Sequence, residues 1–92
     1  MSSQEIQQLE TWHANGQLDQ AKQWLATQLD IHDDDADLHY WMGNICRSQS
    51  DWKHALEHYA IASQLDPQGP GTTAHQLTQQ ILAYRCRDLY NP

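Results

Sequence analysis

The sequence predicts an all-α fold: an antiparallel helix-pair (αα) solenoid made of two repeats and a C-terminal capping helix. Apolar residues recur at helical spacing along the 92-residue chain, and no segment shows the alternation of a strand. Turn-forming residues divide the chain into five such segments. Positions separated by one fixed offset match in kind, as in Ala21 with Ala55 and Leu25 with Tyr59, so the segments form repeating pairs.

The first pair of predicted helices covers the N-terminal third of the chain. The first helix contains Ile6, Leu9 and Trp12 and ends near Gly16, because glycine readily adopts the left-handed conformation that terminates helices. The second helix follows at once and has one apolar face. That face consists of Leu18, Ala21, Leu25 and Leu29.

Three further helices are predicted after the aspartate-rich segment 33–37, whose carboxylates suit the positive end of the next helix. The third helix runs from Leu38 to Cys46 and breaks at 48–51. The fourth ends before Pro67, because proline disfavours helical conformation in the residue before it. After a turn-rich segment, the fifth spans about 72–90 and has an apolar stripe. The stripe consists of Ala74, Leu77, Ile81 and Tyr84.

Composition and charge narrow the function classes. The formal net charge is −7 and the five basic residues are scattered, so we expect no nucleic-acid partner. The N-terminal segment is polar, with neither a signal sequence nor a membrane span, which favours a cytoplasmic protein without a membrane partner. Cys46 and Cys86 fit reduced thiols better than a disulfide framework. The small size and the lack of a catalytic motif predict that the protein is not an enzyme.

Two segments invite a metal-binding interpretation. His54 and His58 share a helix face, but Cys46 is poorly placed to join them, and two imidazoles alone make a weak site. The aspartate-rich segment 33–37 lacks the glycine and the glutamate that a calcium loop requires. We therefore expect no metal and no cofactor, with weak zinc binding by the two histidines as an open alternative.

The middle of the chain closely resembles the tetratricopeptide repeat, whose period of about 34 residues equals the offset between the matching positions. Segment 36–69 has the family's residues at the family's offsets: Met42, Gly43, Trp52, Ala55, Tyr59, Ala62, Leu65 and Pro67. His39 and Cys46 depart from the pattern, and segment 2–35 matches it more weakly. The ending of the chain also resembles the tails of small stand-alone bacterial proteins of this family. The resemblance implies a single domain over 1–92, with repeat one at 2–35, repeat two at 36–69 and the capping helix at about 72–90.

The resemblance also implies a function, because such proteins hold a peptide or a partner helix in a concave groove. The groove positions carried over by the repeat offset are Ile6, Glu10, His13, Tyr40, Trp41, Asn44, Arg47, His75 and Thr78. Of the family's carboxylate-binding set only Asn44 clearly conforms, so we expect an apolar or mildly basic peptide rather than a terminal carboxylate.

A second function class stays open beside this adaptor of unknown partner. Exposed aromatic residues, or the amphipathic capping helix, would instead bury against another copy of the chain and form a structural homodimer.

Overall fold

The protein folds into five α-helices in chain order, and over the described residues there is no strand. The computed structural model describes the backbone of residues 2–90 and the side chains of residues 2–84. The helices are α1 (Ser3–Ala14), α2 (Leu18–Ile31), α3 (Ala36–Ser48), α4 (Trp52–Leu65) and α5 (Pro70–Tyr90). The prediction of an all-α fold with five helices is confirmed. The fifth helix begins earlier than predicted, because Pro70 fits the first turn, where its missing N–H is not needed.

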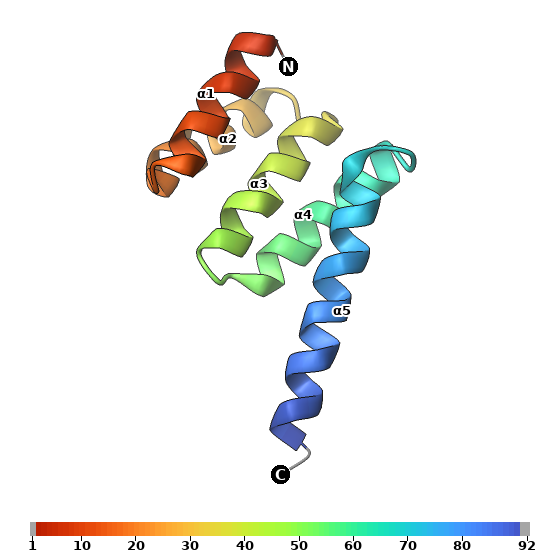
Figure 1. Ribbon diagram of the computed structural model, residues 1–92. Coiled ribbons are helices and arrows are strands. Elements are labelled where there is room, and N and C mark those ends of the chain that lie inside the picture. Colours follow the sequence, from red (N-terminus) through yellow and green to blue (C-terminus); the bar gives the residue numbers. More distant parts are fainter. Residues whose placement is uncertain (1, 91–92) are drawn as a thin grey trace.

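The helices pack in sequence order (Figure 1). In Figure 1 α1 and α3 lie beside each other, and a hydrogen bond of 2.7 Å joins His13 near the end of α1 to Ser48 at the end of α3. The fifth helix packs against α4 and touches α3. It then continues past the other helices toward the C terminus, giving an elongated molecule of 47 × 29 × 20 Å.

The helix ends follow the local signals in the sequence. The Ser2 hydroxyl and the Glu5 carboxylate form a capping box at the start of α1. The Asp35 carboxylate caps α3 by accepting a 2.9 Å hydrogen bond from the backbone N–H of Asp37. After α1, Gly16 has a φ of +73°, as the sequence predicted for this helix end.

The helix ends also repeat at the offset that relates the matching positions of the sequence. Ala14 and Ser48 close α1 and α3, and α2 and α4 share the same offset at both their ends. Gly16 and Ser50 are related by it as well, and they are the two described residues with positive φ, at 73° and 62°. The periodicity therefore extends from residue type to backbone conformation.

The core lies between the helix pairs and contains residues from α1 to α4. Its fully buried members are Leu9, Ala21, Leu25, Ile45, Ala55 and Tyr59. A Cβ on Gly43 would lie 2.5 Å from the Tyr59 ring, so only glycine lets α3 and α4 approach this closely. Gly71 of α5 has the same role against Ala62 of α4, at 2.6 Å. Small residues thus set the spacing on both sides of α4.

Candidate binding groove

A cavity of about 370 Å³ opens between α3 and α5. Its α3 wall consists of Tyr40, Asn44 and Arg47, and its α5 wall of Pro70, Thr73, Ala74 and Leu77. Within each set most successive residues are three or four positions apart in the sequence, so each set occupies one face of its helix. The sequence had predicted the three α3 residues as groove positions, and the structure places them together on this wall.

The orientation of the Asn44 side chain is set from behind the cavity. The Tyr59 hydroxyl donates a 2.5 Å hydrogen bond to Oδ1 of Asn44. Burial raises the pKa of Tyr59 to about 12, so this hydroxyl keeps its proton at neutral pH. Because Oδ1 accepts from the tyrosine, the Nδ2 amide is the hydrogen-bond donor that remains on this cavity-lining side chain.

Arg47 brings a positive charge to the same wall. The side chain is half-buried, and among the described residues no carboxylate lies within 4.0 Å of its guanidinium. A guanidinium supplies five N–H donors and no acceptor. The polar part of the α3 wall is therefore dominated by donors, whereas Leu77 and the Tyr40 ring supply apolar surface.

The other predicted groove residues of α1 and α3 lie away from this cavity. Trp41 packs against the core and meets Tyr40 edge-on, with 6.1 Å between ring centroids. Ile6 is half-buried and Glu10 is exposed, and His13 is engaged by the Ser48 hydroxyl. The structure thus gathers Tyr40, Asn44 and Arg47 but does not bring the α1 positions to the same wall.

On α5 the cavity is lined by residues other than the two that the repeat offset selected. Thr78 is fully buried and donates a 2.7 Å hydrogen bond to the Ala74 carbonyl, and His75 is half-buried without lining the cavity. Sequence reasoning missed Thr73 and the groove-facing role of Leu77. The available signal was the apolar stripe itself, which contains Leu77.

That apolar stripe of α5 is largely uncovered. Leu77 is 49% exposed, Ile81 39% and Tyr84 66%. The face that meets α4 instead contains Gly71, whose added Cβ would strike Ala62, and the buried Thr78. Periodicity identified one apolar face of α5, but the close contact at Gly71 fixes which face meets α4.

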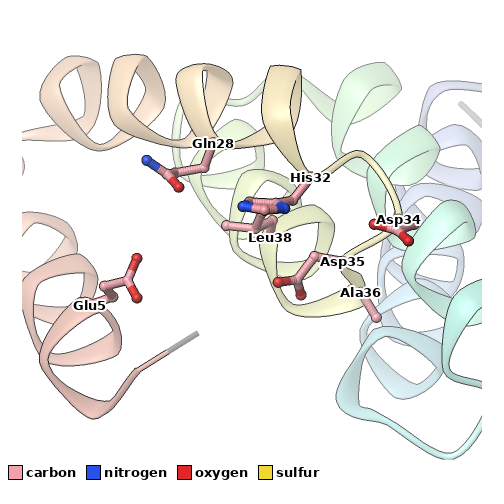
Figure 2. A pocket seen from close by; sticks show the side chains of 7 residues that line it. All are labelled: Glu5, Gln28, His32, Asp34, Asp35, Ala36 and Leu38. Carbon is pink, nitrogen blue, oxygen red and sulfur yellow. The ribbon is translucent and has the colours of Figure 1, made fainter.

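A second cavity, of about 490 Å³, lies where α1, the end of α2 and the start of α3 come near one another (Figure 2). Figure 2 shows Glu5 of α1 across the cavity from His32, Asp34 and Asp35. Two of the three carboxylates serve helix starts: Glu5 belongs to the capping box of α1, and Asp35 caps α3. The Ser2 backbone N–H donates to the Glu5 carboxylate and lowers its pKa. Helix capping thus accounts for Glu5 and Asp35.

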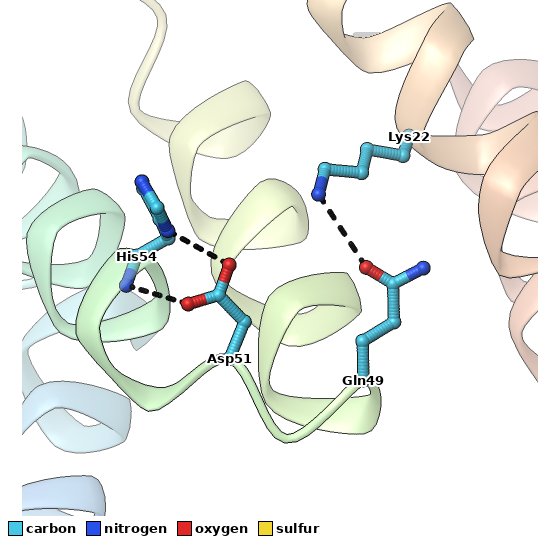
Figure 3. A network of polar contacts seen from close by, with 4 residues as sticks. All are labelled: Lys22, Gln49, Asp51 and His54. Atoms are coloured by element: carbon cyan, nitrogen blue, oxygen red, sulfur yellow. Dashed lines mark hydrogen bonds and ion pairs between the residues drawn. The ribbon is translucent and has the colours of Figure 1, made fainter.

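The two histidines of α4 have separate partners. Nδ1 of His54 lies 2.7 Å from the Asp51 carboxylate, whose other oxygen caps α4 (Figure 3). Figure 3 also shows Lys22 of α2 donating to Gln49 at the end of α3. In the described part of the chain, no three histidine, cysteine or acidic side chains are grouped so as to hold a metal ion.

His58 faces His39 of α3 instead. Their Nδ1 atoms are 3.1 Å apart, and Nε2 of His39 lies 2.7 Å from the Asp33 carbonyl. The ring centroids are 5.4 Å apart, which exceeds the nitrogen separation by roughly two ring radii, so the rings meet edge to edge. Burial, followed by the charge of His39, lowers the pKa of His58. Two nitrogens that point at each other across 3.1 Å are placed for a hydrogen bond between the rings rather than turned toward a shared metal ion.

The described cysteine lies in the core. Cys46 is a free thiol, 1% exposed, and burial raises its pKa. The side chain of Cys86 lies outside the described residues.

No described helix is both long enough and apolar enough to cross a membrane. No family model matches the chain, and no curated protein or solved structure matches it. The function of the α3–α5 cavity is therefore inferred from the residues that line it.

Proposed function

We propose that the protein is a peptide-binding adaptor of the tetratricopeptide-repeat type, with α1–α2 and α3–α4 as its two repeats and α5 as the cap. The constant interval between helix ends supports the repeats, as does the positive φ shared by Gly16 and Ser50. The same interval separates Ala36, where α3 starts, from Pro70, where α5 starts, so α5 occupies the position of the first helix of a third unit.

One observation carries the binding function: donors and apolar surface converge on the α3–α5 cavity. The Nδ2 amide of Asn44 and the guanidinium of Arg47 can hold backbone carbonyls of an extended peptide, while Leu77 contacts an apolar side chain. The volume of about 370 Å³ suits a few residues rather than a folded domain. A peptide segment is the ligand that uses both kinds of surface.

Charge refines the ligand further. The net charge of −7 attracts a basic peptide from a distance, but Arg47 repels a basic side chain from the cavity itself. We therefore expect an apolar residue in the cavity and basic residues outside it. This preference agrees with the expectation from the sequence that the ligand is an apolar or mildly basic peptide rather than a terminal carboxylate.

The experiment is a selection from a random peptide display library on the purified protein. Peptides that bind the wild type are then titrated against Asn44→Ala and Leu77→Asp variants, with Gln79→Asp on another face of α5 as the charge-matched control. We expect about tenfold weaker binding to Leu77→Asp and about fivefold weaker binding to Asn44→Ala, with the control unchanged. Equal binding to all four proteins would show that the groove is not the site.

The same peptides, made with free and with amidated C termini, test the carboxylate. Equal affinities support recognition of the peptide body, whereas a marked loss on amidation would show that Arg47 holds a terminal carboxylate. We propose a cytoplasmic location as well, because the free buried thiol of Cys46 is typical of reducing compartments. In this proposal the groove holds its ligand without catalysis.

A further inference from the structure

The exposed stripe of α5 is an apolar surface that the packing of α5 does not use. Of the six large hydrophobic residues exposed in the described structure, three lie on this one face: Leu77, Ile81 and Tyr84. They are spaced four and three residues apart, so they form a continuous stripe. Isolated exposed apolar side chains need no explanation, whereas a contiguous set marks an interaction surface.

The packing of α5 against α4 leaves this stripe exposed. Gly71 packs against Ala62 of α4, and the buried Thr78 lies about two turns further along the same face, beside the stripe rather than within it. Beyond its contact with α4, α5 continues away from the other helices (Figure 1). The C-terminal part of the stripe therefore lies where another molecule can reach it.

The charge distribution selects the occupant. Segment 67–84 contains no acidic residue, lysine or arginine, whereas segment 2–66 contains eleven acidic residues and three basic ones. Two copies that approach through segment 2–66 bring acidic surfaces together, which is unfavourable. Two copies that approach through the 70–84 part of α5 meet no such repulsion from that segment, and Arg85, Arg87 and Asp88 follow it on the same helix.

The residue types on this face are also self-complementary. In a twofold-symmetric interface the same patch is used by both subunits, so residues near the axis meet their own copies. Leucine, isoleucine and tyrosine pack against themselves. The flanking Gln80 pairs with itself, because its amide contains both a donor and an acceptor. A charged residue in the same place would oppose association.

We propose that the stripe Leu77, Ile81 and Tyr84 is the interface of a homodimer in which α5 of one copy packs antiparallel on α5 of the other. A stable specific interface buries about 800 Å² per partner, more than one stripe of three side chains supplies. The dimer is accordingly weak, with a dissociation constant on the order of 10 µM or above.

Dimerisation and the groove share a residue, since Leu77 belongs both to the stripe and to the cavity wall. Pairing of α5 covers the side of the cavity that Leu77 forms, so the dimer competes with a bound peptide. This consequence rests on the proposed function, but the dimer itself does not. By linkage, a peptide that prefers the monomer dissociates the dimer to the same degree that dimerisation weakens the peptide.

The test is sedimentation equilibrium of the full chain over a concentration series that reaches the millimolar range. We expect the wild-type mass to rise toward that of a dimer. Tyr84→Glu should weaken association about tenfold or more, because it places a charge in the apolar interface; a factor of ten corresponds to about 1.4 kcal/mol. Gln79→Glu introduces the same charge on another face of α5 and should leave association unchanged.

Tyr84 is 66% exposed, so its substitution should not affect folding; far-UV circular dichroism of both variants checks this. A wild type that stays monomeric throughout would overturn the proposal, as would equal association of the two variants. Peptide binding is measured separately, in dilute protein where the monomer dominates. A missing dimer therefore leaves the adaptor function standing, and absent peptide binding leaves the dimer standing.

Discussion

The contact between His39 and His58 predicts that the protein loses stability in mild acid. With both rings neutral, Nε2–H of His39 donates to the Asp33 carbonyl, and Nδ1 of His39 accepts from Nδ1–H of His58. One additional proton leaves this contact intact when His58 takes it at Nε2, because its Nδ1–H still donates to His39. A second would place two N–H groups against each other at 3.1 Å, which breaks the contact.

The sign of the effect follows from proton counting. The pKa of His58 is lowered below its usual 6.5, first by burial and then by the charge of His39. His54 and Lys22 act in the same direction and Glu57 opposes them. The unfolded chain binds a proton at His58 near pH 6.5, while the folded chain binds it only at a lower pH. Stability is thus full above about pH 6.5 and falls as the pH drops toward the lower folded pKa of His58.

The size of the change in stability is set by the number of protons that the unfolded state binds and the folded state does not. For one proton the free energy of unfolding falls by at most about 1.4 kcal/mol per pH unit. Between roughly pH 6.5 and pH 5.5 complete loss of this proton from the folded state would amount to about 1 kcal/mol, and because His58 is only partly buried we expect less than that. The carboxylates of Glu5 and Asp51, whose pKa values are lowered, titrate below this window.

The assay is urea denaturation at several values between about pH 7.5 and pH 5.5, on wild type, His58→Gln and His54→Gln. His54 is an exposed histidine of the same helix, bonded to Asp51, and serves as the control. We expect the slope of stability against pH to flatten in His58→Gln alone. Parallel slopes in the wild type and His58→Gln would refute the reasoning, and so would equal flattening in both variants.

Three sets of substitutions test the packing on either side of α4. Gly43→Ala should cost about 1–3 kcal/mol in urea denaturation, because its Cβ would lie 2.5 Å from the buried Tyr59 ring; an unchanged midpoint would contradict this. Tyr59→Phe should cost about 1 kcal/mol by removing the hydrogen bond to Asn44, and Asn44→Ala should add little to it in a double-mutant cycle. Gly71→Ala should lower the melting temperature through contact with Ala62, and Ala62→Gly should partly restore it in the double variant; additive losses would disprove that contact.

The helices were predictable because their signals are local. Gly16 ended the first helix as expected, and an aspartate from segment 33–37 caps α3. The approach of α3 to α4 at Gly43 was also predictable, because a small residue opposite an aromatic at the repeat spacing has few other uses. The residues of the α3 wall were expected from the resemblance to the tetratricopeptide repeat, and Tyr40, Asn44 and Arg47 share one helix face in the structure.

The remaining features depend on how helices are rotated against one another, which spacing alone does not fix. His54 and His58 are neighbours on α4, and the sequence paired them for that reason. In the fold His58 turns to His39 on the preceding helix, and His54 turns to Asp51. The only indication of the His39–His58 contact in the sequence was that His39 departs from the repeat pattern. It did not identify His58, which lies on the next helix, as the partner.

The rotation of α5 determines both the groove and the stripe. Apolar content alone would place Leu77, Ile81 and Tyr84 against α4, because that burial gains the most from the hydrophobic effect. The structure instead buries Gly71 and Thr78, and at Gly71 even a Cβ would lie 2.6 Å from that of Ala62. Close backbone approach at Gly71 therefore leaves the larger side chains facing α3 and solvent. If α5 served only to cover α4, its apolar face would be turned inward, so the exposed stripe is consistent with the proposed second copy that covers it.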